Sequence, residues 1–238
     1  EDSVFSLRNL SAERKFAFYQ AGHVRLKDLP TQGLNDKQII QVASAEQGVH
    51  IDREKIHEFL SSLSYPLYLL DFETVQPALP PYSGLRPYRQ IPFQYSLHIL
   101  ARDGGLEHRE FLADEKSDPR RTLADALVND ISAEHLIMVF NASFEKGVLR
   151  SLAEWFPDLA DSLEAMRAYI VDLHVPFQKM HYYDPAMRGS ASLKSILPAL
   201  IPEMETAYAQ LEIRHGGMAM DAYSALPYIA EPKEREHL

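Results

Sequence analysis

The stretch from Tyr65 to Thr74 reads YPLYLLDFET and is the most informative segment of this 238-residue chain. Its apolar run, PLYLL, is typical of a strand that is buried on both faces. Asp71 and Glu73 follow two residues apart, so on a strand both carboxylates point to the same face. Two such carboxylates repel each other and lose hydration, which is unfavourable unless a cation compensates. The alternative is that the strand ends here and both acids reach water.

The residues that follow this strand carry alternating strand and helix signals. A hairpin turn is expected at Gly104-Gly105, and a helix opens at Asp118-Pro119 with proline in its first turn. Hairpin strands followed by alternating strands and helices predict an α/β domain, with a mixed central sheet flanked by helices. The predicted strands cover 66–70, 93–101, 108–112, 136–140 and 170–173, and the predicted helices cover 118–133, 143–155, 159–168, 192–201 and 217–226.

The N-terminal part of the chain has a different texture. Residues 1–63 contain three short helical patterns, which begin after Ser11, Asn35 and Asp52, side chains that cap helices well. We therefore predict a small helical leader subdomain over 1–63 and an α/β domain over 64–238. Because the chain begins with Glu1 rather than methionine, we also expect it to be a piece of a longer protein.

Composition narrows the class of protein further. Apolar residues make up 46% of the chain and charged residues 24%, as in ordinary globular proteins, and no run is long enough to span a membrane. The absence of cysteine excludes disulfides and thiolate metal sites, and a cytoplasmic protein is expected. The 34 acidic residues outnumber the 24 basic ones, which argues against a tight nonspecific binder of nucleic acid. The excess of acid does not exclude an enzyme whose carboxylates hold divalent metals.

Two further acidic motifs stand beside the first. In NASFE, residues 141–145, a buried strand ends and Glu145 falls in the first turn of the next helix, near its positive end. In GGMAMDAY, residues 216–223, small residues would let a late helix that carries Asp221 approach the sheet closely. The alternatives are an ordinary acid at a helix start for Glu145 and a solvent-facing acid for Asp221.

The order of these motifs resembles a known family. DFE at 71–73, NASFE at 141–145, DL at 172–173, SLK at 192–194 and the late GMAMDA resemble the DEDD-type 3′–5′ exonucleases of the ribonuclease H-like fold. More closely, the phrases at 65–74, 86–100, 189–203 and 216–223 look like the bacterial DUF2779 group. That group resembles an uncharacterised branch of the superfamily, often found behind a Cas4-like nuclease domain. The resemblance covers residues 65–226.

The resemblance implies a metal-dependent site made of carboxylates. Two ions, Mg²⁺ or Mn²⁺, would be held by Asp71 as the bridging ligand, with Glu73 and Asp221 on the side of the attacking water. Glu145 would stand where the family has an aspartate. Asp172 is a reserve ligand, expected mainly to support the site from behind. The expected contacts with nucleic acid are Asn141, Lys194, as a phosphate contact, and Tyr223.

The sequence departs from the family at its general base. Counting from Asp221, the positions where the family has a histidine or tyrosine fall on Gly216 and Gly217, which leaves His215 or Tyr223 as substitutes. The leading hypothesis is a metal-dependent 3′–5′ exonuclease that hydrolyses phosphodiester bonds at the 3′ end of DNA or RNA. The alternative is a catalytically weak ribonuclease H-like module that binds nucleic acid or a partner domain within a larger protein. A third possibility is a structural spacer.

Overall fold

The computed structural model describes residues 2–114, 116–132, 134–204 and 216–229, and these residues form two compact units. The first, called here the helical unit, consists of residues 2–62 and 174–204. The second, called the sheet unit, consists of residues 63–173 and 216–229. The border at residue 62 lies one residue from the predicted one. The grouping of 174–204 with the leader differs from the predicted division, in which that segment belonged to the α/β domain.

The helical unit brings the two segments together through a short strand pair. His50 pairs with Tyr183 and Ile51 with Tyr182 in an antiparallel arrangement, and Asp52 N–H donates to the carbonyl oxygen of His181 at 2.8 Å. These bonds hold 174–204 against the leader. The elements of the unit are η1 (Val4–Ser6), α1 (Ala12–Gln20), η2 (Leu26–Asp28), α2 (Asp36–Gln47), β1 (His50–Ile51), α3 (Arg53–Ser61), α7 (Val175–Gln178), β7 (Tyr182–Tyr183), η4 (Pro185–Met187) and α8 (Leu193–Leu200).

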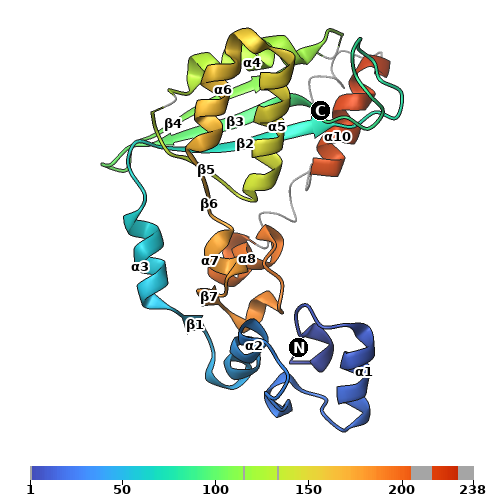
Figure 1. Cartoon of the computed structure of the whole chain (residues 1–238), viewed down its shortest axis with the longest axis vertical. Helices are drawn as coiled ribbons and strands as arrows, with labels where there is room; N and C mark the ends of the chain where they lie inside the picture. Colours follow the sequence, from blue (N-terminus) through green and yellow to red (C-terminus); the bar gives the residue numbers. More distant parts are fainter. Residues whose placement is uncertain (1, 115, 133, 205–215, 230–238) are drawn as a thin grey trace. The chain divides into compact units, whose positions relative to one another are not determined.

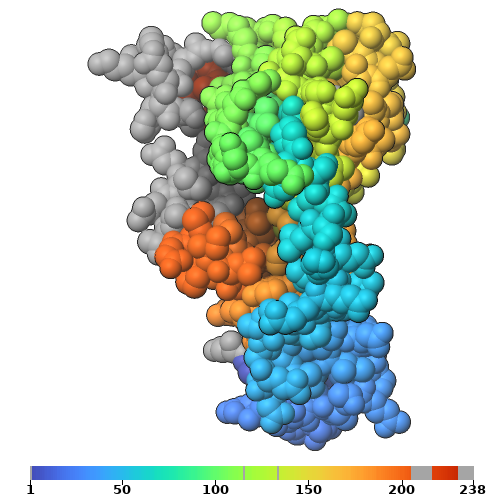
Figure 2. All heavy atoms as spheres, turned by 90° about the vertical axis from the view of Figure 1, so that its left-hand side faces the viewer, coloured from blue at the N-terminus to red at the C-terminus, as the bar shows by residue number. Residues whose placement is uncertain are grey.

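The three predicted helix caps are present in the leader. The side chains of Ser11, Asn35 and Asp52 accept backbone N–H groups in the first turns of α1, α2 and α3, and Gln38 completes a capping box with Asn35. α3 buries no side chain, and its residues form part of the surface that faces the viewer in Figure 2. The small core of the unit consists of Val4, Leu7, Leu26, Leu29 and Val42.

The described residues of the sheet unit contain a five-stranded mixed sheet, in the order β4-β3-β2-β5-β6. β2 is central: it pairs antiparallel with β3 on one side and parallel with β5 on the other. The elements are β2 (Leu67–Val75), β3 (Ile91–Leu100), β4 (Leu106–Leu112), α4 (Pro119–Asp130), β5 (Ile137–Val139), α5 (Ala142–Trp155), η3 (Pro157–Leu159), α6 (Ala160–Ala168), β6 (Ile170–Asp172), α10 (Gly216–Ala225) and η5 (Leu226–Tyr228).

One face of the sheet carries the main core. α4, α5 and α6 lie over the sheet in Figure 1, and their leucines pack with Leu70 and Phe72 of β2, which are 3% and 2% exposed. α10 packs against β2 as well. The predicted α/β class, with a mixed central sheet flanked by helices, is therefore confirmed. No helix among the described residues is long and apolar enough to cross a membrane.

Candidate functional site

The alternation of β2 separates its apolar residues from its acids. Leu70 and Phe72 face the core, and Asp71 and Glu73, which alternate with them along the strand, point to the opposite face. The strand does not end at the first acid, as one reading of the sequence had it, but continues to Val75. The pairing with β3 shifts register directly after Glu73. Bulges are common next to functional sites, where they re-aim side chains, and this irregularity directly follows Glu73.

Both carboxylates of β2 have a raised pKa. Asp71 keeps access to solvent, but the protein around it removes part of its hydration, which raises its pKa against the opposing effect of the Phe72 backbone N–H. Partial burial also raises the pKa of Glu73, and the nearby negative charge of Asp71 adds to it. The two acids therefore destabilise each other's charged form.

Glu145 joins this pair from the next strand along the sheet. Because β2 and β5 are parallel, the turn after β5 lies at the edge that β2 approaches with its acids, and α5 begins there. Glu145 is 2% exposed, and burial raises its pKa to about 8, with the charges of Asp71 and Asp172 contributing further. Its Oε2 atom is buried and has no hydrogen-bond partner within the part of the chain that the structure describes. A buried acceptor of this kind is unfavourable unless a proton or cation meets it.

Asp172 holds the start of α5 in place. It ends β6, and its two carboxylate oxygens accept the backbone N–H groups of Asn141 at 3.0 Å and Ala142 at 3.1 Å. Asn141 adopts a left-handed conformation with φ 78°, which turns the chain sharply from β5 into α5. Ser143 Oγ donates to Asn141 Oδ1 at 2.7 Å, so this exposed amide is engaged in the turn. Asp172 thus supports the placement of Glu145.

α10 approaches β2 through a glycine. A Cβ atom built on Gly216 would lie 2.9 Å from Glu73 Oε2, closer than a side-chain carbon can pack. The absence of a side chain at this position therefore makes room for the Glu73 carboxylate. Asp221, further along the same helix, is exposed. The charge of Asp71 acts on both Glu73 and Glu145, so these three predicted ligands are neighbours, and the role of Asp221 as a ligand stays a prediction.

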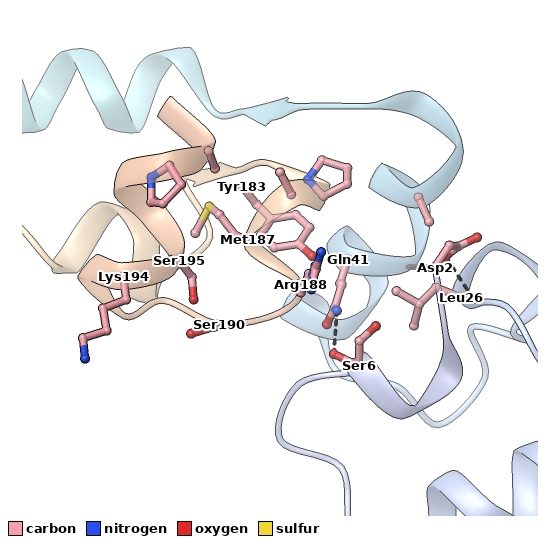
Figure 3. A pocket seen from close by; sticks show the side chains of 15 residues that line it. Asp2, Ser6, Leu26, Gln41, Tyr183, Met187, Arg188, Ser190, Lys194 and Ser195 are labelled. Atoms are coloured by element: carbon pink, nitrogen blue, oxygen red, sulfur yellow. Dashed lines mark hydrogen bonds between the residues drawn. The ribbon is translucent and has the colours of Figure 1, made fainter. Parts of the chain in front are cut away.

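The remaining predicted residues have other surroundings. Tyr223 is buried, its ring stacks on Phe93 with centroids 4.0 Å apart, and its hydroxyl donates to the carbonyl oxygen of Asp114 at 3.3 Å. Lys194 belongs to the helical unit, where it lines a cavity of about 620 Å³, and Figure 3 shows it on α8 beside Ser195. His215, a candidate for the base, lies outside the described residues.

The three carboxylates of Asp71, Glu73 and Glu145, called here the acidic group, suit a hard cation. The donors of this group are oxygen atoms alone, they repel one another, and the buried oxygen of Glu145 lacks a partner among the described residues. In their present rotamers, however, no three histidine or acidic side chains in the described ranges lie close enough to hold one ion. Metal binding at this group therefore requires a rearrangement of its side chains.

Two features of the site were not predicted as such. The capping of α5 by Asp172 depends on contact between residues thirty apart in the chain, which no local pattern reveals. The close approach of Gly216 to Glu73 has a sequence signal in the glycine pair that opens GGMAMDAY, although the partner could not be read from it.

Comparison with known proteins places the chain in a family. The family model described as "Domain of unknown function (DUF2779)" matches residues 68–192, more than half of the chain, and the protein belongs to this family. The match includes Asp71, Glu73, Glu145 and Asp172. No curated protein and no solved structure matches the chain.

Proposed function

We propose that the sheet unit has a ribonuclease H-like fold and acts as a metal-dependent 3′–5′ exonuclease on DNA or RNA. The observation that carries the proposal is the convergence of Asp71, Glu73 and Glu145, three carboxylates with raised pKa values, at one edge of the sheet. Acids whose pKa values are raised by lost hydration and by one another's charge are concentrated at functional sites. The mixed sheet flanked by helices, with its acids on the central strand, supports the proposed fold.

The proposed roles follow from the positions of the side chains. The charge of Asp71 raises the pKa of both Glu73 and Glu145, so Asp71 is the residue that would contact both ions. Glu73 and Glu145 would each complete one side, and Asp172 would keep Glu145 in place by capping α5. Bound Mg²⁺ or Mn²⁺ would supply a water of lowered pKa and charge stabilisation for the leaving 3′ oxygen. Asp221 on α10 is the proposed fourth ligand.

The second candidate function is a catalytically weak module that binds nucleic acid or a partner, such as a Cas4-like nuclease domain in a longer protein. One observation favours it: Gly216 and Gly217 occupy the positions where the resemblance places a general base. The two candidates differ in whether divalent metal supports cleavage.

Cleavage of 5′-labelled single-stranded DNA and RNA tests the proposal. The full chain would be incubated with Mn²⁺, Mg²⁺ or EDTA, beside Asp71→Asn and the matched control Asp161→Asn, an exposed aspartate of α6. We expect a metal-dependent ladder that shortens from the 3′ end, at least 100-fold slower in Asp71→Asn, on the order of what transition-state electrostatics contribute, and unchanged in Asp161→Asn. Equal rates in the two variants would refute the assignment. Absence of both cleavage and calorimetric Mn²⁺ binding would favour the binding module.

A further inference from the structure

The helical unit has a charge balance different from that of the sheet unit. Its described residues include eleven lysines and arginines against ten acidic residues, whereas the sheet unit has ten against seventeen. The acidity of the chain is thus concentrated in the sheet unit. The helical unit therefore offers cations that do not all have acidic partners.

Arg8 is held in place by two buried glutamines of α2. Gln41 Oε1 accepts the backbone N–H of Arg8 at 2.9 Å, and Gln38 Nε2 donates to the Arg8 carbonyl oxygen at 2.9 Å. The two glutamines are 0% and 3% exposed. Gln41 Nε2 also donates to the carbonyl oxygen of Ser6 at 2.8 Å, and Figure 3 draws this contact as a dashed line between the labelled Gln41 and Ser6. Burying two amides to fix one residue is unfavourable unless every group is satisfied, so this network orders the backbone of Arg8 firmly.

The side chain of Arg8, in contrast, lacks a matching partner. The guanidinium is partly buried, and its Nη1 donates to the thioether sulfur of Met180 at 2.7 Å, a weak acceptor. Its buried Nε has no hydrogen-bond partner among the described residues, and burial lowers the pKa of Arg8. No carboxylate of the described residues pairs with it. An ordered cation with unused donors is suited to receive an anion.

Arg8 lines a cavity of about 450 Å³ whose other polar residues are also able to donate. Among the described residues that line it there is no aspartate or glutamate, and there is a second permanent cation, Lys37. The Ser192 hydroxyl lies within a chain of serine contacts to Ser190 and Ser195, both at 3.1 Å. The lining consists of Arg8, Asn9, Lys37, His174, Gln178, Ala191 and Ser192.

We propose that this cavity of the helical unit is a binding site for a phosphate group, received by the Arg8 guanidinium, the Lys37 ammonium and the Ser192 hydroxyl. Arginine and lysine around neutral donors, with no acid in the lining, match a multiply charged tetrahedral oxyanion better than a single carboxylate. The site belongs to the helical unit and shares no residue with the acidic group of the sheet unit, so the inference does not depend on the proposed nuclease activity. The phosphate belongs to a nucleotide or to an oligonucleotide backbone, and the chemistry is shared.

Titration of the full chain with inorganic phosphate and pyrophosphate tests this site. Calorimetry would be performed in EDTA at constant ionic strength, with chloride and acetate as comparison anions, so that the outcome is independent of cleavage at the acidic group. We expect pyrophosphate and phosphate to bind. Arg8→Met should lower the affinity for both by about tenfold or more, as loss of a charge-assisted contact does. Lys37→Met should weaken them several-fold, and Lys27→Met, an exposed lysine outside the cavity, should not.

Two results would overturn the proposal: phosphate binding no stronger than that of acetate or chloride, or unchanged affinity in Lys37→Met. The second test stands even if Arg8→Met fails to fold, because the Lys37 side chain makes no hydrogen bond or ion pair with any described residue, so its replacement leaves the fold intact. Titration with octathymidylate and with thymidine monophosphate then identifies the source. If Arg8→Met weakens the binding of the octamer, the ligand is the backbone of a nucleic acid. If it weakens the binding of the mononucleotide only, the ligand is a free nucleotide.

Discussion

Glu145 is a buried carboxylate, and the stability of the protein depends on its protonation. Its pKa rises from 4.5 to about 8 on folding, so the folded state holds the proton more tightly than the unfolded state. Stability from this group is therefore complete below pH 4.5 and is lost as the pH rises through about 8. Without divalent metal, the wild type should lose unfolding free energy, on the order of 4 kcal/mol, across this window.

Substitution of this residue separates the two contributions. In EDTA, Glu145→Gln should remove most of the pH dependence between 4.5 and 8 and should unfold at a higher temperature than the wild type at pH 8. With Mn²⁺ the wild type should unfold at the higher temperature, because the ionised Glu145 binds the cation more tightly than the neutral amide of the variant does. Thermal unfolding followed by circular dichroism checks both. The same pH slope in wild type and variant would contradict the assigned pKa.

A second prediction at this scale concerns Gly216. A methyl group at this position would displace the Glu73 carboxylate, the flexible partner in the 2.9 Å contact, rather than the helix. Gly216→Ala should therefore leave the unfolding temperature nearly unchanged while weakening Mn²⁺ binding by about 10- to 100-fold, as loss of support for a metal ligand does. The matched control is Gly147→Ala on α5, where a Cβ meets nothing within 4 Å. That variant should gain up to about 1 kcal/mol in stability and keep its metal affinity.

At the scale of secondary structure, Asp172 links the end of β6 to the start of α5. Asp172→Ala would leave the N–H groups of Asn141 and Ala142 without this acceptor, and it should lower the unfolding free energy by about 1–3 kcal/mol. Asp172→Asn, which retains one acceptor oxygen, should lose less. Urea denaturation with both variants checks this. If Asp172→Ala instead abolished metal binding at unchanged stability, Asp172 would be a ligand rather than a cap.

The elements themselves were largely predictable from local patterns. The capped helices, the Gly104-Gly105 hairpin and the buried strands appear near their predicted bounds, because side-chain periodicity and capping act over a few residues. Three members of the acidic group could also be foreseen, since acids after apolar strands of one sheet meet at its edge. The exposure of Asp221 could not be foreseen, because it depends on the orientation of α10, which its pattern of small residues leaves open.

On the scale of the whole molecule, the helical unit is discontinuous in sequence, and this was not predicted. β1 and β7 have two residues each and are more than 130 residues apart, so neither gives a periodic signal. Buried Tyr183 and Met187 depend on the leader in the described structure, since Tyr183 pairs with His50.

Truncation tests the discontinuity. A chain that begins at residue 63 would lack the partner of β7, so residues 174–204 should lose their protection from hydrogen exchange, and the truncated protein should aggregate or bind a hydrophobic dye. Residues 67–75 should keep their protection. If 174–204 remained equally protected in the truncated chain, the segment would fold without the leader, as the predicted division at 63 assumed.

The alternation of core and site residues along β2 also limits which insertions and deletions the sequence can accept during evolution. Leu70 and Phe72 build the core, Asp71 and Glu73 build the candidate site, and only their order along the strand assigns each to its face. Insertion or deletion of one residue just before them would send the carboxylates into the core and the apolar side chains to the site. Related chains should therefore vary freely in length over 76–90 but keep the length of 67–75. Within this strand, evolution can therefore exchange one residue for another but cannot add or remove a single residue.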